Sequence, residues 1–216
     1  DIAAFVPQLK SFDEVLTLQA QISGSADNIN IQDLVLAYGD KIHLVANTEI
    51  KDLRDTHKMY ILGSIDDFTA TADGIQNLAN NFSKQKKSLP KEIFNLGKIS
   101  FQGDISGYLD QLTAFGSFDT NLGMVKTDIL FRYKHQKWMD YTCEGKIYSS
   151  DFDLGKLLGD SHFNKIALGV DINIEKPMYK SIKGKADGTI FNFDYNNYSY
   201  KDITLNGNYD GQVADG

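Results

Sequence analysis

Apolar and polar residues alternate strictly along most of this chain, which is typical of half-buried antiparallel strands. In one such segment Ile42 and Leu44 fall on one side and His43 falls on the other. The same alternation recurs in residues 16–23, 99–107, 125–134, 139–147, 166–174 and 203–209. Turn sequences such as Asn206-Gly207 stand between the alternating segments. The pattern therefore predicts a mostly β protein built from antiparallel strands.

Two short stretches have helical character instead. Asp73 is expected to cap a helix that runs from about residue 75 to residue 83. Asp153 is expected to begin a short helical turn that Gly159 closes. The basic run 84–87 reads as a solvated loop. We therefore expect one or two short helices that connect or cap strands.

A weak internal repeat runs through the chain. Two Ile-Ser-Gly sequences end at Gly24 and Gly107, and a looser third copy surrounds Gly188, so the spacings are 83 and 81 residues. Repeated strands with a short helical segment suggest an elongated stack. We expect a single fragment, residues 1–216, with weak repeats at approximately 1–72, 73–150 and 151–216.

The apolar side of the alternation has two interpretations. It could be the core of a closed sandwich or barrel, or the floor of an open, curved sheet that forms a U-shaped hydrophobic groove. The repeat favours the open groove, because stacked strands lengthen a groove without having to close it. The expected groove lining consists of Leu16, Leu18, Ile22, Leu34, Leu36, Ile42, Leu44, Ile99, Phe101, Ile105, Phe118, Ile129, Phe131, Met139, Tyr141, Ile147, Leu168, Val170, Ile172, Ile203 and Leu205.

Charge and hydropathy narrow the range of partners. The chain carries 22 basic and 29 acidic residues, a net charge of −7 that disfavours nucleic acid. Its longest apolar runs, residues 2–6 and 34–38, have five residues, so no transmembrane segment is expected. The first residue is Asp1 and the last two are Asp215 and Gly216, directly after strand-like sequence, which predicts an internal fragment of a longer protein.

Candidate chemistry is sparse. No nucleophile elbow, dinucleotide fingerprint or paired-histidine zinc motif is present, and the four histidines lack ligand spacing. Residues 151–155 begin like a calcium loop, but His162 stands where a glutamate is needed. Cys143 is in phase with Tyr141, as expected of a buried structural thiol. We expect no catalytic residue, metal site or cofactor, and therefore no enzyme.

Several sequence segments resemble the TamB family, the translocation and assembly module within the AsmA-like proteins of the Gram-negative envelope. The most specific is Asp-Phe-Asp-Leu-Gly-Lys-Leu-Leu-Gly at residues 151–159. Others are Phe-Val-Pro-Gln-Leu at residues 5–9, the Ile-Ser-Gly repeats, and residues 99–109 with the Ala-Phe-Gly-Ser-Phe sequence at 114–118. The likeness covers essentially the whole chain.

The resemblance implies a fold and a cellular role. The fold would be a slice of a long periplasmic β-groove, or β-taco, in a parent protein anchored in the inner membrane. Family members are implicated in phospholipid transport between the inner and outer membranes, and in outer-membrane protein assembly with a barrel partner. The expected ligand is therefore a phospholipid or another acyl-chain compound. The alternative is a β-sandwich adhesin or glycan-binding module at the cell surface, with an aromatic platform that includes Trp138 and Tyr198.

Overall fold

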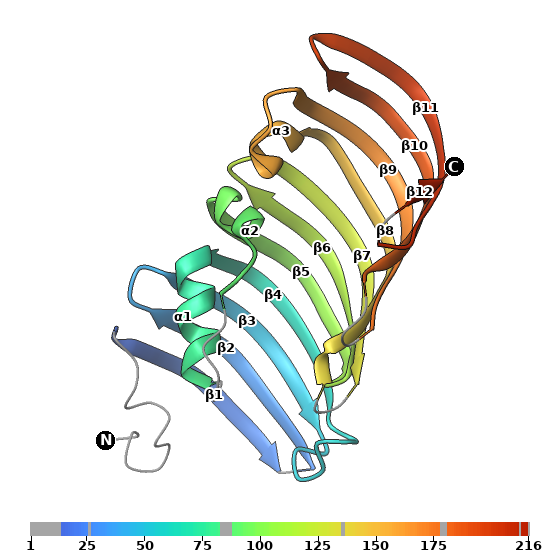
Figure 1. Cartoon of the computed structure of the whole chain (residues 1–216). Coiled ribbons are helices and arrows are strands. Elements are labelled where there is room, and N and C mark those ends of the chain that lie inside the picture. Colours follow the sequence, from blue (N-terminus) through green and yellow to red (C-terminus); the bar gives the residue numbers. More distant parts are fainter. Residues whose placement is uncertain are drawn as a thin grey trace.

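The structure is a computed structural model that describes residues 14–25, 27–82, 88–134, 137–177, 181–211 and 213–215. In this part of the chain the strands form one antiparallel sheet whose spatial order follows the sequence from β1 to β12 (Figure 1). The strands are β1 (Leu16–Ser25), β2 (Asn28–Tyr38), β3 (Ile42–Lys51), β4 (Tyr60–Thr71), β5 (Lys98–Tyr108), β6 (Gln111–Thr120), β7 (Gly123–Lys134), β8 (Lys137–Asp153), β9 (Phe163–Lys176), β10 (Lys183–Tyr195), β11 (Tyr198–Tyr209) and β12 (Ala214–Asp215). The helices are α1 (Ala72–Phe82), α2 (Lys91–Asn95) and α3 (Leu154–Leu158).

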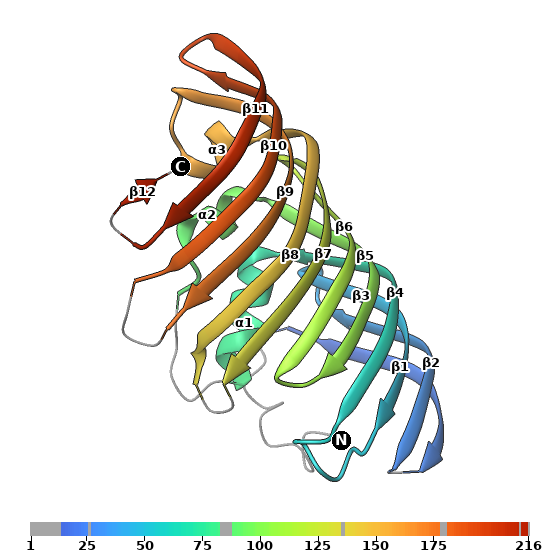
Figure 2. The same cartoon turned by 90° about the vertical axis from the view of Figure 1, so that its right-hand side faces the viewer.

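The sheet is curved and open. Its strands bend around an inner side, and all three helices lie on that side (Figures 1 and 2). Strands β1 and β12 stand at opposite ends of the strand order and do not pair with each other. Every strand of the described residues belongs to this one sheet, so no second sheet packs against it. The predicted open, curved antiparallel sheet is confirmed, and the closed-sandwich interpretation is wrong.

β-Bulges preserve the two faces of the sheet. In β2 the pairing with β3 shifts between Ile31 and Leu34, and Asp33 has a φ of 51° there. A bulge adds one residue to a strand, so residues of opposite parity can point to the same side. Ile31 and Leu34 consequently share a face, although they lie three positions apart. The strict alternation of apolar and polar residues along the sequence is therefore interrupted at each bulge. The apolar residues on both sides of the bulge still lie on the same face of the sheet.

Helix α1 begins earlier than expected. The hydroxyl of Thr71 accepts a hydrogen bond from the backbone N–H of Gly74 at 3.1 Å, which is the N-cap contact. Asp73 lies in the first helical turn and is not the cap. The prediction that Asp73 caps the helix is therefore wrong by two residues. Thr71 and Asp73 both have side chains that can cap a helix, and the position at which β4 ends decides that Thr71 does so.

Helix α3 forms as the sequence predicts. The Asp153 side chain accepts a hydrogen bond from the backbone N–H of Lys156 at 2.9 Å, and Gly159 ends the helix in the left-handed region at φ 67°. Helix α2, which follows Pro90, has only five residues and was not expected. The basic run 84–87 lies outside the described residues. None of the described helices is long and apolar enough to cross a bilayer.

The best-packed part of the molecule lies under α1. Tyr38, Ile42 and Ala70 are buried side by side on neighbouring strands. Ile75 and Leu78 of α1 pack against them. The helices thus cover one end of the strands on the inner side. They stand in the chain between β4 and β5 and between β8 and β9, while the division into three repeats stays a prediction.

Candidate functional site: the apolar inner face

Two cross-strand rows at the middle of the inner face contain no charged side chain, whereas Lys176 pairs with Tyr141 on this face near the end of β9. Directly paired residues of neighbouring strands project to the same face. One row crosses β1 to β11 through Ile22, Ile31, Thr48, Gly63, Ile105, Ala114, Ile129, Gly145, Ile172, Ala186 and Gly207. The next row consists of Gly24, Ile29, Ile50, Ile61, Gly107, Leu112, Phe131, Cys143, Ile174, Gly184 and Tyr209. Neither row contains an acidic or basic side chain, and the thiol of Cys143 and the phenol of Tyr209 are their only ionisable groups.

The register brings the expected lining residues together. Every one of them whose side chain is described lies on this inner face: Leu16, Leu18, Ile22, Leu34, Leu36, Ile42, Leu44, Ile99, Phe101, Ile105, Phe118, Ile129, Phe131, Tyr141, Ile147, Leu168, Val170, Ile172, Ile203 and Leu205. Met139 belongs to β8, but its side chain lies outside the described residues. Their role as a lipid-binding lining stays a prediction.

The exposure of these side chains varies along the face. Ile42, Ile99 and Phe101 are buried close to the helices. Leu18 and Ile22, on the edge strand β1, are 60% and 66% exposed. Most of the remaining lining residues are half-buried. A fully packed core would bury them, so the half-buried values show that much of the inner face remains accessible.

Some inner-face residues were missed from sequence. Phe68 pairs with Leu44 and Phe101, and Val125 pairs with Phe118, so both extend the same apolar row. The bulge between Ile65 and Phe68 interrupts the alternation of apolar and polar residues, so the alternation does not assign Phe68 to the inner face. Val125 was visible in the alternation but was not among the expected lining residues.

Glycines concentrate on the inner face and suit a bent sheet. The strand glycines at inner-face positions are Gly24, Gly63, Gly103, Gly107, Gly116, Gly123, Gly145, Gly184, Gly188 and Gly207. Gly145 has a φ of +140°, and a Cβ placed there would lie 2.0 Å from the carbonyl oxygen of Asp128. Side chains crowd on the concave side of a curved sheet, so glycine there permits close approach of neighbouring backbones.

Two apolar hollows follow the inner face. The first, of about 460 Å³, lies between the helices and the sheet, and it is lined by Phe68, Ile75, Leu89, Ile93, Leu96, Ile99, Phe118, Thr120, Val125 and Phe152. The second, of about 620 Å³, lies at the β9–β11 end, and its apolar lining includes Ile172, Ile174, Ile182, Ala186 and Leu205. Space for apolar groups is thus present in both halves of the molecule.

Two polar groups interrupt this face without adding charge. Burial raises the pKa of the Cys143 thiol, and the neighbouring Glu144 raises it further. The thiol therefore stays protonated at neutral pH. The hydroxyl of Thr127 is buried and has no hydrogen-bond partner in the described part of the chain.

Ionisable side chains outside the inner face form local pairs. His43 Nδ1 lies 3.1 Å from Asp67 Oδ2, and His162 Nδ1 lies 2.7 Å from Asp160 Oδ1. Hydrogen bonds from the backbone and the ring of His162 lower the pKa of Asp160. Among the described residues, no group of three or more histidine, cysteine, aspartate or glutamate side chains could hold a metal ion.

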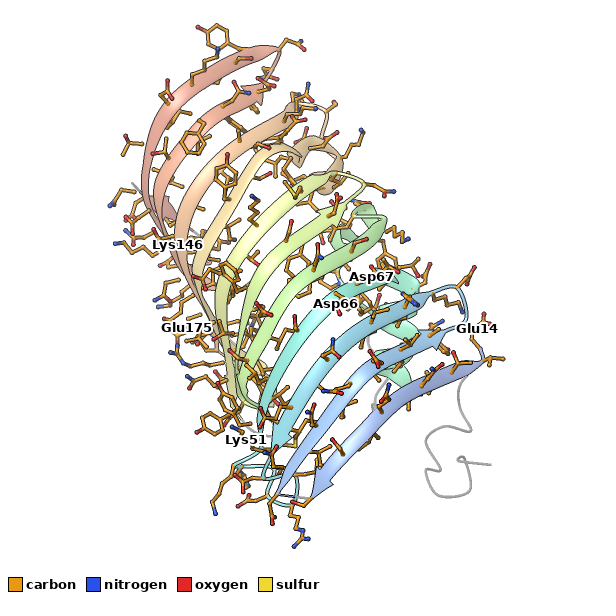
Figure 3. All side chains as sticks on the ribbon, turned by 180° about the vertical axis from the view of Figure 1, so that it is seen from behind. Glu14, Lys51, Asp66, Asp67, Lys146 and Glu175 are labelled. Atoms are coloured by element: carbon orange, nitrogen blue, oxygen red, sulfur yellow. The ribbon has the colours of Figure 1, made fainter. Side chains whose placement is uncertain are left out.

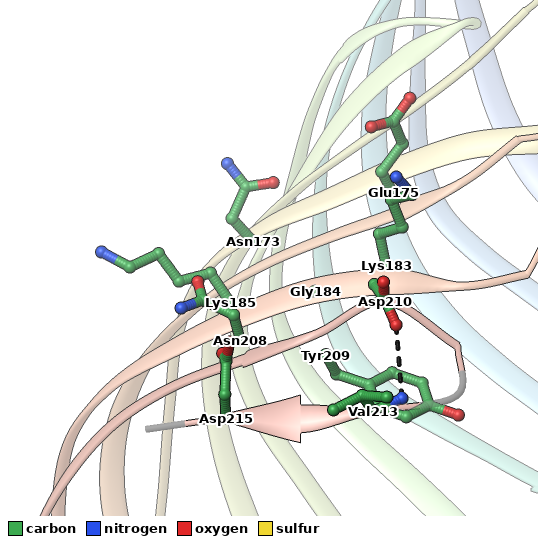
Figure 4. Close-up of a pocket in the computed structure, with 10 residues that line it drawn as sticks. All are labelled: Asn173, Glu175, Lys183, Gly184, Lys185, Asn208, Tyr209, Asp210, Val213 and Asp215. Atoms are coloured by element: carbon green, nitrogen blue, oxygen red, sulfur yellow. Dashed lines mark hydrogen bonds between the residues drawn. The ribbon is translucent and has the colours of Figure 1, made fainter.

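A polar hollow of about 450 Å³ lies at the C-terminal end of the sheet (Figure 4). Acidic, basic and amide side chains line it together, among them Glu175, Lys183 and Asn208. The Asp210 carboxylate accepts a hydrogen bond from the backbone N–H of Val213 at 3.2 Å. Its lining mixes both charges, and it adjoins the second apolar hollow, with which it shares Gly184 and Tyr209 of the inner face.

Comparison of the chain with models of protein families, with characterised proteins and with solved structures gives no match. The resemblance to the TamB family therefore stays a prediction from the sequence.

Proposed function

We propose that the inner face shields the acyl chains of lipids, and that the chain is a segment of a periplasmic protein that moves phospholipid between two membranes. One observation supports this function more strongly than any other. Two rows without charged side chains run along the inner face across eleven strands, β1 to β11, and no second sheet of the described residues covers that face. Contiguous exposed apolar patches on soluble proteins mark interaction sites.

The energetics suit an acyl chain. Each methylene group removed from water contributes about 0.8 kcal/mol, so a chain of ten or more carbons gains several kcal/mol along such a face. Strands about 4.8 Å apart give eleven strands a length of about 50 Å. The two rows place isoleucine and other apolar side chains in series among small residues, without a charged group between them, which favours movement along the face over trapping at one point.

The outer face has the opposite character. Charged residues such as Lys146 and Glu175 point away from the sheet on that side (Figure 3). Some of them form cross-strand pairs, for example Arg132 with Glu144 at 2.6 Å. The sheet thus separates an oily side from a solvated one, as a lipid shield in an aqueous compartment requires.

The neighbours Ile129 and Leu130 provide a matched test. Both are half-buried in β7; Ile129 pairs with Ala114 and Gly145 on the inner face, and Leu130 pairs with Thr113 and Glu144 on the outer face. We expect Ile129→Asp to weaken binding of a fluorescent C16 fatty acid at least tenfold, because a carboxylate in an apolar site must be desolvated. Leu130→Asp should stay within about twofold of the unchanged chain, since its carboxylate remains in water.

The readouts are a fluorescence titration and the rate at which the Cys143 thiol is alkylated. Cys143 lies in the row next to Ile129, so a bound chain should slow its alkylation. Far-UV circular dichroism checks that both variants fold. Equal fatty-acid binding by the two variants would contradict an acyl-binding inner face.

We further propose, from the family resemblance alone, the cellular setting of this activity. The chain would lie in the periplasm of a Gram-negative envelope, within a parent protein anchored in the inner membrane. That parent would support outer-membrane protein assembly together with a barrel assembly factor. Photo-crosslinking in cells from Ile129 and from Leu130 would test the lipid contact in that setting, since only the inner position should capture phospholipid.

A further inference from the structure

The outer face of β5–β8 contains a hollow with a different chemistry from the inner face. Two cross-strand rows form it. The first row is Gln102, Ser117, Lys126 and Tyr148, and the second is Asp104, Phe115, Asp128 and Lys146. Together they line a space of about 410 Å³, whose floor includes the backbone of Gly103 and Gly116. This size lies within the range of small-ligand sites, about 300–1,000 Å³. We call it the outer hollow.

Aromatic rings stand exposed in and beside the outer hollow. Phe115 is 59% exposed and Tyr148 is 45% exposed. Phe191, 43% exposed, extends the aromatic surface, because its ring centroid lies 6.2 Å from that of Tyr148. Single exposed apolar residues are ordinary, but rings gathered around a hollow mark an interaction site.

The charged side chains of the outer hollow are not engaged with one another. Asp128 and Lys146 are direct cross-strand partners, yet neither they nor Asp104 and Lys126 form an ion pair or a side-chain hydrogen bond with any residue that the structure describes. Elsewhere on the outer side such pairs do close, as between Lys165 and Asp151 at 2.7 Å. The outer hollow therefore presents two carboxylates and two ammonium groups whose hydrogen-bonding capacity is directed to solvent.

This combination selects one class of ligand. The surface that faces the outer hollow is mostly apolar, formed by the rings and the alkyl stems of the lining side chains, and the four charged groups stand at its rim. An anionic polymer would meet the two carboxylates and a chain of net charge −7. A pyranose ring has an apolar face that stacks on an aromatic ring, and a rim of hydroxyls that both donate and accept hydrogen bonds. We propose that the outer hollow binds a saccharide, with a sugar ring on Tyr148 or Phe115 and its hydroxyls bonded to Asp128 and Lys146.

The test uses the whole chain and three soluble probes: cellohexaose, chitohexaose and maltohexaose. Saturation-transfer NMR identifies which of them binds, and isothermal titration gives the affinity. At least one probe is expected to bind, and Tyr148→Ser is expected to weaken that binding about tenfold through loss of the stacking surface. Asp128→Asn should also weaken it, because the amide is a poorer acceptor than the carboxylate.

Tyr108→Ser is the matched control. Tyr108 lies on the same outer face with a similar exposure, 48%, and its ring contacts Tyr60 outside the outer hollow. Binding should be unchanged in this variant and in Ile129→Asp, which separates the outer hollow from the acyl-binding inner face. Failure of all three probes to bind would overturn the saccharide site, and so would an equal loss in Tyr108→Ser and Tyr148→Ser.

Discussion

Replacing Gly145 with alanine tests whether the bend of the sheet depends on close backbone contact at its inner face. Gly145 pairs with Ile129 and Ile172 in the middle of the sheet. Its φ of +140° lies in a region that residues with a Cβ rarely adopt, and the added methyl group would lie 2.0 Å from the Asp128 carbonyl oxygen. The β7–β8 ladder must therefore move apart, or the residue must change its backbone conformation.

The expected loss follows from these two effects. A non-glycine residue held in such a backbone region costs about 1–3 kcal/mol. Relieving a contact with a backbone atom adds to this, because a carbonyl in a ladder cannot rotate away without losing a hydrogen bond worth about 1 kcal/mol. We expect Gly145→Ala to lower the free energy of unfolding by about 3 kcal/mol. For a chain of this length that corresponds to a fall of about 6–12 °C in Tm.

Gly184→Ala is the matched control. Gly184 lies on the same inner face, but its φ is not in the left-handed region, and an added Cβ would meet its nearest neighbour, the Asn173 carbonyl oxygen, at 3.6 Å. This variant should be neutral or gain about 0.4–1 kcal/mol from the lower entropy of the unfolded chain. Thermal unfolding followed by far-UV circular dichroism measures both. Equal Tm values would refute the reasoning that glycine permits the bend.

Two further predictions concern single polar groups. Thr127→Val should raise the free energy of unfolding by about 1 kcal/mol in urea titrations, because it removes a buried hydroxyl without a partner; a loss of stability would show that the hydroxyl is bonded. Asp153→Ala should cost about 1 kcal/mol through loss of the α3 cap, whereas Asp153→Asn, which keeps an acceptor, should cost less. Burial raises the pKa of Asp153, but hydrogen bonds from the Lys156 side chain and backbone outweigh it and lower that pKa overall. The charged cap therefore stabilises fully above about pH 4 and loses its effect as the pH falls through the lowered pKa. A pH titration of Tm should show this loss in the unchanged chain and not in Asp153→Ala.

The alternation of side chains was readable from sequence because it is local. A strand sends successive residues to opposite faces, so Ile42 and Leu44 could be assigned to one face without knowing their partners. Helix α3 was equally readable, since Asp153 and Gly159 mark its two ends and lie only six positions apart. Most of the inner-face residues could be assigned in the same way, whereas Phe68, which follows a bulge, could not.

Several other features could not be predicted from the sequence. The α1 cap is Thr71 and not Asp73, because the end of β4 fixes where the helix starts. Helix α2 has only five residues and no side-chain cap, so its sequence carries too little helical signal to reveal it. The aromatic platform of Trp138 and Tyr198 stays a prediction, since the Trp138 side chain lies outside the described residues; Tyr198 lies beside Tyr200 in β11, with ring centroids 4.9 Å apart. The outer hollow instead joins Phe115 and Tyr148 from different strands.

The sequence by itself determined that this chain forms antiparallel strands with one oily and one polar face, because both properties follow from the identity of each residue and its immediate neighbours. Only the tertiary structure decided that the strands stay in a single open sheet, with helices over one end of its inner side (Figure 2). Closure depends on the twist and bend summed over all strands, and on whether backbones can approach at glycines such as Gly145. The total twist and bend cannot be read from any short segment of the sequence. The same alternation of apolar and polar residues is therefore compatible with a sandwich, a barrel or an open groove.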